Sequence, residues 1–327
     1  MENKTSDNPG KQVERPSREI TTAGAVLETA TLVLIILISV LGNFFICHVV
    51  RKNRRLHCFV FVFIFSQAVS DMLMAVFVMP LTALTLSTGK WMTSDFICSA
   101  QGTLILTFSL TSLHTMALIA VNRFFRAVKP HLYRRFFTKR SVAAMITFIW
   151  LLAVVWSLLP LALSWGSFFF HLRKSTCFIR FRDVLHIENT VYTAFTMFLY
   201  VLLPIVVISH SYWKIFKIVK HHQAAVNPLS NENYRLNVEE VKVIRILFAS
   251  MIGFAVCWIP VIIFEAVDTA LGDLPRAAHL AYIYLAFVSC SICPLIYITM
   301  HRQFRTELCR LFHVNCSQAR VQTDNVS

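Results

Sequence analysis

Charge is scarce in this sequence. Asp, Glu, Lys and Arg make up only 15% of its 327 residues, whereas about a quarter is usual for a water-soluble domain. Glycine is scarce as well, with 8 residues against 28 phenylalanines, and the nine cysteines are too few for a scaffold held together by disulfides. Hydrophobic residues account for 56% of the chain, which is more than one or two water-soluble cores could bury. Most of this apolar surface must therefore face lipid.

Long apolar stretches indicate where the chain crosses the membrane. A spanning helix needs about 20 mostly apolar residues. Seven stretches meet this requirement, at roughly 25–50, 58–86, 96–122, 141–164, 190–213, 243–269 and 277–300. We therefore expect an all-α membrane protein with a seven-helix bundle over 25–300. Because the tail 1–24 has no apolar core of the kind found in a cleaved signal peptide, the first stretch is expected to act as an uncleaved anchor.

The basic residues indicate which end of the chain lies outside the cell. If residue 1 is outside, the inner segments are 51–57, 123–140, 214–245 and 301–327, and they hold 21 of the 31 Lys and Arg residues. Such an excess in short loops marks the cytoplasmic side. We therefore predict a multi-pass plasma-membrane protein with an extracellular amino terminus, glycosylated at Asn3 in the sequon Asn3-Lys4-Thr5. The net charge of +14 is explained by membrane side, so nucleic acid is not an expected partner.

Polar and kinking residues within the spans narrow the function. Asp71 lies about midway along the second stretch, where a carboxylate costs a few kcal/mol and is expected to face the bundle interior. It is either a structural hydrogen-bonding centre or a cation or proton site. Pro204, Pro260 and Pro294 should bend the last three spans. A receptor, a secondary transporter and a channel all remain open, although no internal repeat typical of transporters is visible and no catalytic cluster suggests an enzyme.

Seven short motifs in register resemble those of the rhodopsin-like, or class A, G-protein-coupled receptors. They are Leu41-Gly42-Asn43, Ser70-Asp71, Cys98, Asn122-Arg123-Phe124, Trp150, Cys257-Trp258-Ile259-Pro260 and Cys293-Pro294-Leu295-Ile296-Tyr297. The resemblance covers about 25–312. It implies a receptor without a cofactor that binds an extracellular ligand and activates a heterotrimeric G protein.

The resemblance also implies a disulfide and a conformational switch. Cys98 would pair with Cys177 in the second outer loop. Arg123 would pair with Glu240 at rest, and breaking this contact would free the inner end of the sixth span. Asn122 stands where the family usually has aspartate, so a raised basal activity is expected. The residues implied for the switch are Asp71, Asn122, Arg123, Pro204, Tyr212, Glu240, Phe254, Trp258, Pro260, Pro294 and Tyr297.

The family's sodium site is only partly present. Asp71, Ser112 and Ser289 could supply oxygen ligands, but Cys293 and Phe108 occupy positions that are usually polar, and a thiol is a poor ligand for sodium. We expect weak or absent sodium binding. Segment 301–312 alternates apolar residues with arginines at helical spacing, which predicts an amphipathic helix lying on lipid, followed by the tail 313–327. Cys309 or Cys316 is a candidate palmitoylation site.

The resemblance assigns a mostly apolar ligand pocket. Its residues are Gln101, Ile105, Leu106, Ser109, Thr196, Met197, Tyr200, Val261, Ile262, Glu265, His279, Ile283 and Phe287. Ile105 stands where amine receptors carry the aspartate that pairs with the ligand, so a biogenic amine is not expected. Phe287 stands where opsins carry the lysine that binds retinal, so retinal is excluded.

The ligand class stays open between two alternatives. The segments Val121-Asn122-Arg123 and Val128-Lys129-Pro130, with a short third inner loop at about 221–238, are similar to melatonin-like and orphan receptors. Basic residues in the second outer loop, Arg173, Lys174, Arg180 and Arg182, instead suggest a peptide or an acidic small molecule. The short loop favours the inhibitory class of G protein as the partner, and the basic inner face favours contact with anionic lipid.

Overall fold

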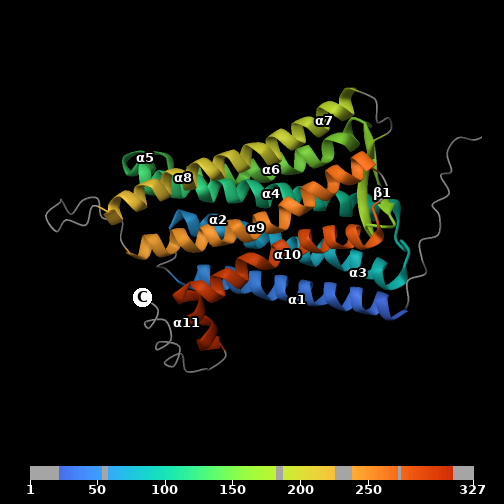
Figure 1. Ribbon diagram of the computed structural model, residues 1–327, viewed down its shortest axis with the longest axis horizontal. Helices are drawn as coiled ribbons and strands as arrows, with labels where there is room; N and C mark the ends of the chain where they lie inside the picture. The colour runs from blue at the N-terminus through green and yellow to red at the C-terminus, as the bar shows by residue number, and fades with distance from the viewer. Residues whose placement is uncertain (1–21, 54–57, 182–186, 225–237, 272–273, 312–327) are drawn as a thin grey trace, which may run out of the picture.

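The computed structural model describes residues 22–53, 58–181, 187–224, 238–271 and 274–311. Within these residues, six helical segments are long and apolar enough to cross a membrane. They are α1 (Thr22–Lys52), α2 to α3 (Phe59–Thr88), α4 (Asp95–Val128), α6 (Lys139–Ala162), α9 (Val238–Leu271) and α10 (Arg276–Met300). The remaining span is formed by α7 (Ile187–Met197), η3 (Phe198–Leu202) and α8 (Leu203–Ala224). The predicted seven-helix bundle is confirmed, and Figure 1 shows its long helices running side by side.

Two of the spans contain a π-helical segment, and a proline follows each at the same spacing. Segment η2 (Met74–Val78) separates α2 (Phe59–Leu73) from α3 (Met79–Thr88) and ends two residues before Pro80. Segment η3 likewise ends two residues before Pro204. Because proline lacks an N–H and its ring crowds the preceding turn, the helix widens there instead of breaking. The sequence predicted a bend at Pro204 but not the π-helical turns.

Small and polar side chains pack the first span against the last. Any side chain on Gly42 would meet the Pro294 ring, because a Cβ built there lies 2.6 Å from its Cβ. Asn43 donates hydrogen bonds of 2.8 Å to the backbone oxygens of Ser39 and Cys290. The hydroxyls of Ser39 and Ser291 are 2.7 Å apart. Close backbone approach and interhelical hydrogen bonds of this kind hold helices together in lipid, where apolar burial alone cannot.

The two ends of the bundle differ in structure. At one end a hairpin of β1 (Gly166–His171) and β2 (Thr176–Phe181) covers the helices, pairing antiparallel with Gly166 opposite Phe181. At the other end lie the short helix α5 (Pro130–Phe136) and α11 (Arg302–Leu311), which turns away from the bundle axis (Figure 1). Phe304 of α11 is fully buried against Phe45 and Tyr297, with ring centroids 6.3 and 5.4 Å away.

Candidate functional site

An apolar cavity of about 440 Å³ lies within the bundle beneath the hairpin. Its walls come from η2, α4, β2, α7, η3, α8, α9 and α10. Ten of the residues predicted for the ligand pocket line it: Ile105, Leu106, Ser109, Thr196, Met197, Val261, Ile262, Glu265, Ile283 and Phe287. Pockets for small molecules commonly enclose about 300–1,000 Å³ and are mainly apolar. The cavity therefore has the size and lining expected of a small-molecule site.

The other three residues predicted for the pocket have different surroundings. Gln101 is 1% exposed and its side chain holds the loop, donating to the Val78 oxygen and the Thr82 hydroxyl and accepting from the Cys177 amide at 3.1 Å. His279 lies beyond the cavity lining, with its Nε2 atom 3.5 Å from Asp268. Tyr200 lies in η3, and its side chain is outside the described residues.

The hairpin is fastened over the cavity by a disulfide and by packing. The predicted bond between Cys98 and Cys177 is confirmed, and it joins the first turns of α4 to β2. Phe168 of β1 occupies the space above Gly102, where an added Cβ would lie 2.2 Å from the ring. Because Gly102 has no side chain, the Phe168 ring packs directly against α4. This contact fixes the position of the hairpin on the helix.

A buried lysine from the hairpin turn reaches the outer end of α9. The side chain of Lys174 is only 5% exposed, and its Nζ atom is 2.9 Å from Glu265 and 3.5 Å from Asp268. The ammonium also lies 4.2 Å from the ring centre of Phe178 and 5.0 Å from that of Tyr282. Burying a charge is costly unless it is paired, and here two carboxylates and two aromatic faces compensate it.

His171 lies beside this lysine in the outer loop. Burial, with the positive charge of Lys174 next in importance, lowers the pKa of His171 to about 4. Its Nδ1 atom accepts a 3.3 Å hydrogen bond from the Lys174 amide, and its ring centre is 5.5 Å from that of His279. At neutral pH the imidazole is therefore uncharged and supports the turn that carries Lys174.

Asp71 is buried in the bundle interior. Its Oδ1 atom accepts hydrogen bonds from Ser112 at 3.0 Å and from Gln67 at 3.3 Å. From α10 the contacting group is the Cys290 thiol. Ser289 instead donates to the backbone oxygen of Ala286 at 2.6 Å. Of the three side chains predicted for a sodium site, the structure thus joins Asp71 and Ser112 directly.

Aromatic and proline residues connect the cavity to the inner half of the bundle. Phe254 and Trp258 stack with ring centres 5.6 Å apart, both line the cavity, and Pro260 follows within the same helix. Pro204 is buried at the start of α8. A ligand that displaces Trp258 would therefore press on the helix at the position where proline has removed a backbone hydrogen bond.

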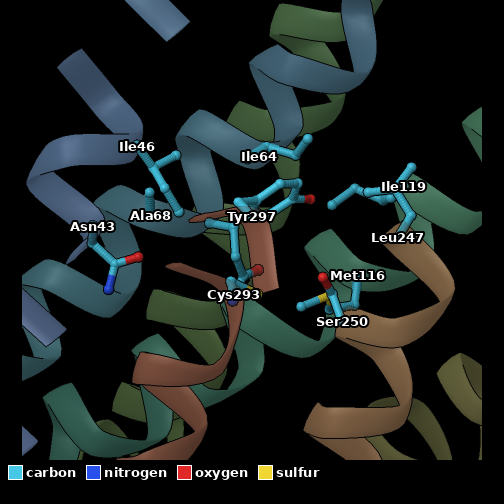
Figure 2. A pocket seen from close by; sticks show the side chains of 11 residues that line it. Asn43, Ile46, Ile64, Ala68, Met116, Ile119, Leu247, Ser250, Cys293 and Tyr297 are labelled. Carbon is cyan, nitrogen blue, oxygen red and sulfur yellow. The ribbon is translucent and has the colours of Figure 1, made fainter. Parts of the chain in front are cut away.

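The inner half of the bundle contains a buried Arg123 near two tyrosines. Arg123 is 4% exposed and Asn122 is fully buried, while Tyr212 and Tyr297 are each 3% exposed. Figure 2 shows Tyr297 at the centre of a small cavity, with Asn43 and Ile46 on one side and Ile119 and Leu247 on the other. Among the described residues, the Tyr212 hydroxyl, the Arg123 Nε and both polar atoms of the Asn122 side chain have no hydrogen-bond partner.

Several predicted residues lie outside what the structure describes. These are Asn3, Cys316 and the side chain of Glu240, whose backbone belongs to the first turn of α9. Cys309 lies in α11.

Sequence reasoning missed two functional features. It took the loop cations as a group and did not single out Lys174 as the buried one, a distinction that no sequence pattern signals. It also missed Cys290, although the spacing Cys290-Ser291-Ile292-Cys293 places the two thiols three residues apart on α10, beside Asp71.

Comparison with known proteins agrees with this architecture. Residues 42–297 match the model of the 7 transmembrane receptor (rhodopsin family). The chain is 26% identical to the histamine H2 receptor of Cavia porcellus, over 93% of this chain and 86% of that receptor. It is 29% identical to the adenosine receptor A3 of Ovis aries, over 84% of this chain and 85% of that one. The crystal structure of squid rhodopsin superimposes with a TM-score of 0.78, at 22% identity, over 94% of this chain and 91% of that chain.

The match covers most of the chain, and it decides between the classes that the sequence left open. The family consists of membrane receptors that signal through G proteins in response to extracellular ligands, so a transporter, a channel and an enzyme are excluded. The chain belongs to the rhodopsin family of seven-transmembrane receptors and is a class A G-protein-coupled receptor of the plasma membrane.

Proposed function

We propose that this receptor binds an extracellular ligand in the apolar cavity and, in response, activates a heterotrimeric G protein of the inhibitory class. The observation that carries the ligand site is the coincidence of ten predicted pocket residues on one cavity of about 440 Å³. Its lining includes the stacked pair Phe254 and Trp258, next to the bend at Pro260. Ligand contact at this pair would be transmitted along α9 to the inner face.

The lining of the cavity argues against two familiar ligand classes. Ile105 supplies no charge in mid-cavity, so a small biogenic amine has no anchor there. Phe287, also in the lining, cannot form the Schiff base that retinal requires. The relatives named above are, by name, receptors for histamine and adenosine. At 26% and 29% sequence identity, neither compound is inferred to be the ligand of this receptor.

The inner face supports the choice of partner. Its loops carry the excess of Lys and Arg, which supports an extracellular amino terminus and would offer a basic surface to an acidic face of a G protein. Inhibitory coupling rests on the short third inner loop alone. Arg123, an always-charged group where the third span meets the cytosol, is the side chain that would contact the inserted G-protein tail.

A reconstituted exchange assay tests this proposal. The receptor in lipid nanodiscs, as wild type and as Glu240→Ala, is mixed with purified inhibitory, stimulatory and calcium-mobilising heterotrimers. Nucleotide exchange should increase with the inhibitory class and be higher for Glu240→Ala, because α9 loses a restraint on its inner end. Arg123→Ala should remove the response. Exchange on another class alone would refute the coupling, and unchanged exchange with Glu240→Ala would refute the restraint.

A further inference from the structure

The cavity is long, and the charged residue in its described lining lies at one end. Its lining follows α9 from Met251 to Glu265, fourteen residues or about 21 Å at 1.5 Å per residue. Among the described residues that line it, Glu265 is the only charged one, and it lies at the end beneath the hairpin. A ligand that fills this space is therefore mainly apolar, with a polar group at its outer end.

The charged residues at the outer end of the cavity indicate whether the polar group of the ligand is a cation or an anion. Two carboxylates, Glu265 and Asp268, contact the single ammonium of Lys174 at 2.9 and 3.5 Å. A ligand anion placed here would face two acids, whereas a ligand cation could take the position of the lysine and leave both acids paired. Exchange of one ammonium for another keeps a positive charge between the two partly buried carboxylates, which removal of the lysine alone would not.

Lys174 holds its ammonium in the position that a ligand cation would take. It comes from the turn between β1 and β2, and the backbone of the neighbouring Ser175 has a positive φ of 49°, a conformation uncommon for a residue with a side chain. Its ammonium lies over the rings of Phe178 and Tyr282, and a ligand ammonium in the same position would keep both contacts. The lysine therefore occupies the polar end of the site as a tethered competitor.

The side of the cavity indicates a route from the membrane. Ile205 of α8 and Ile259 of α9 both line the cavity, and they are 43% and 51% exposed. An amphiphile held in the bilayer could reach the cavity here without passing the hairpin.

Resting on the proposed function, we propose that the ligand is an amphiphile with one ammonium group: its apolar body fills the cavity, and its ammonium replaces Lys174 between Glu265 and Asp268. The chemistry is shared by long-chain amines and by short apolar peptides with a free amino terminus. A dodecylamine probe and an apolar tetrapeptide with a free or acetylated amino terminus distinguish these two sources.

Direct binding to the full receptor in nanodiscs tests the proposal. Binding of tritiated dodecylamine is measured by scintillation proximity. Dodecan-1-ol, dodecanoate and the two forms of the peptide are added as competitors. We expect competition by unlabelled amine or by the free peptide, and none by the alcohol, the carboxylate or the acetylated peptide. Glu265→Gln should weaken amine binding by at least about tenfold, and Lys174→Met should strengthen it, because the internal competitor is removed. Lys90→Met, an exposed outer lysine, is the matched control and should bind like wild type.

The outcomes separate the alternatives. Equal competition by alcohol and amine, or unchanged binding in Glu265→Gln, would show apolar fit alone and overturn the proposal. Preference for the carboxylate, with loss of binding in Lys174→Met, would show that the lysine is itself the anchor for an acidic ligand. The unfolding temperature of each variant is measured first. Glu265→Gln should weaken amine binding and Lys174→Met should strengthen it, so if one variant does not fold, the binding measured with the other still tests the proposal. Since no G protein is present, failure here leaves the exchange result and the proposed function untouched.

Discussion

Glu307 of α11 accepts a 2.9 Å hydrogen bond from the Nζ of Lys52, the last residue of α1. The carboxylate is almost fully buried, and Arg310 donates to its other oxygen at 2.7 Å. The hydrogen bond from Lys52 is the main cause that lowers the pKa of Glu307 below its usual value. This ion pair thus fixes α11 to α1, although the two helices are far apart in the sequence.

Glu307→Gln should loosen α11 without unfolding the bundle. Since both cations are largely exposed, the loss is expected to be about 1 kcal/mol, or roughly fivefold faster hydrogen–deuterium exchange in α11. Because the pKa is lowered in the folded state, the stabilisation is complete above the ordinary glutamate pKa and is lost as pH falls through the folded value. The wild type should therefore approach the variant at acid pH. Arg302→Gln, an exposed residue of the same helix, is the control and should exchange like wild type.

Gly102→Ala should weaken the packing of the hairpin against α4. The new Cβ would lie 2.2 Å from the Phe168 ring, so the ring or the helix must move, at a cost of about 1–3 kcal/mol. We expect a lower unfolding temperature and faster proteolysis of the outer loop, with the disulfide intact. Phe168→Leu in the same chain should restore part of the loss, because the smaller side chain leaves room. If the double variant is no better than Gly102→Ala, the contact is not the cause.

The sequence was sufficient for features that depend on composition and spacing. Apolar stretches predicted the spans, and the resemblance to class A receptors implied the Cys98–Cys177 bond and ten residues that line one cavity. It was insufficient where burial depends on distant partners. Lys174 looks like any loop cation until Glu265, 91 residues away, is seen beside it. Gln101 and His279 carry pocket positions, yet their side chains turn to the loop and to Asp268, because unpaired buried polar groups must find partners.

Acid pH should destabilise the outer hairpin through His171. In the folded chain its pKa is about 4, below the value near 6.5 of an exposed histidine, so the unfolded state binds more protons between these values. Stability is therefore complete above about pH 6.5 and decreases as pH falls through that range. His171→Gln, which cannot titrate, should lose less of its unfolding temperature between pH 7.5 and pH 5 than wild type. Equal losses would assign the acid sensitivity to other groups.

Sodium should have no effect on the wild-type receptor, and one substitution in α10 should create a dependence. The groups around Asp71 are the Ser112 hydroxyl, the Gln67 amide and the Cys290 thiol, and Cys293 supplies a second buried thiol from the next turn. Sodium requires oxygen ligands, which thiols do not supply. We expect the same unfolding temperature in sodium chloride and in N-methyl-D-glucamine chloride.

Cys293→Asn adds an amide oxygen near Asp71, so its unfolding temperature should rise with sodium concentration, as binding to the folded state alone requires. Cys293→Ala is the matched control, because it removes the thiol without adding an oxygen, and it should stay insensitive. A sodium-dependent wild type would contradict the prediction by showing that Asp71 and Ser112 suffice as ligands. Insensitivity of Cys293→Asn would instead show that the thiol at this position is not what excludes the ion.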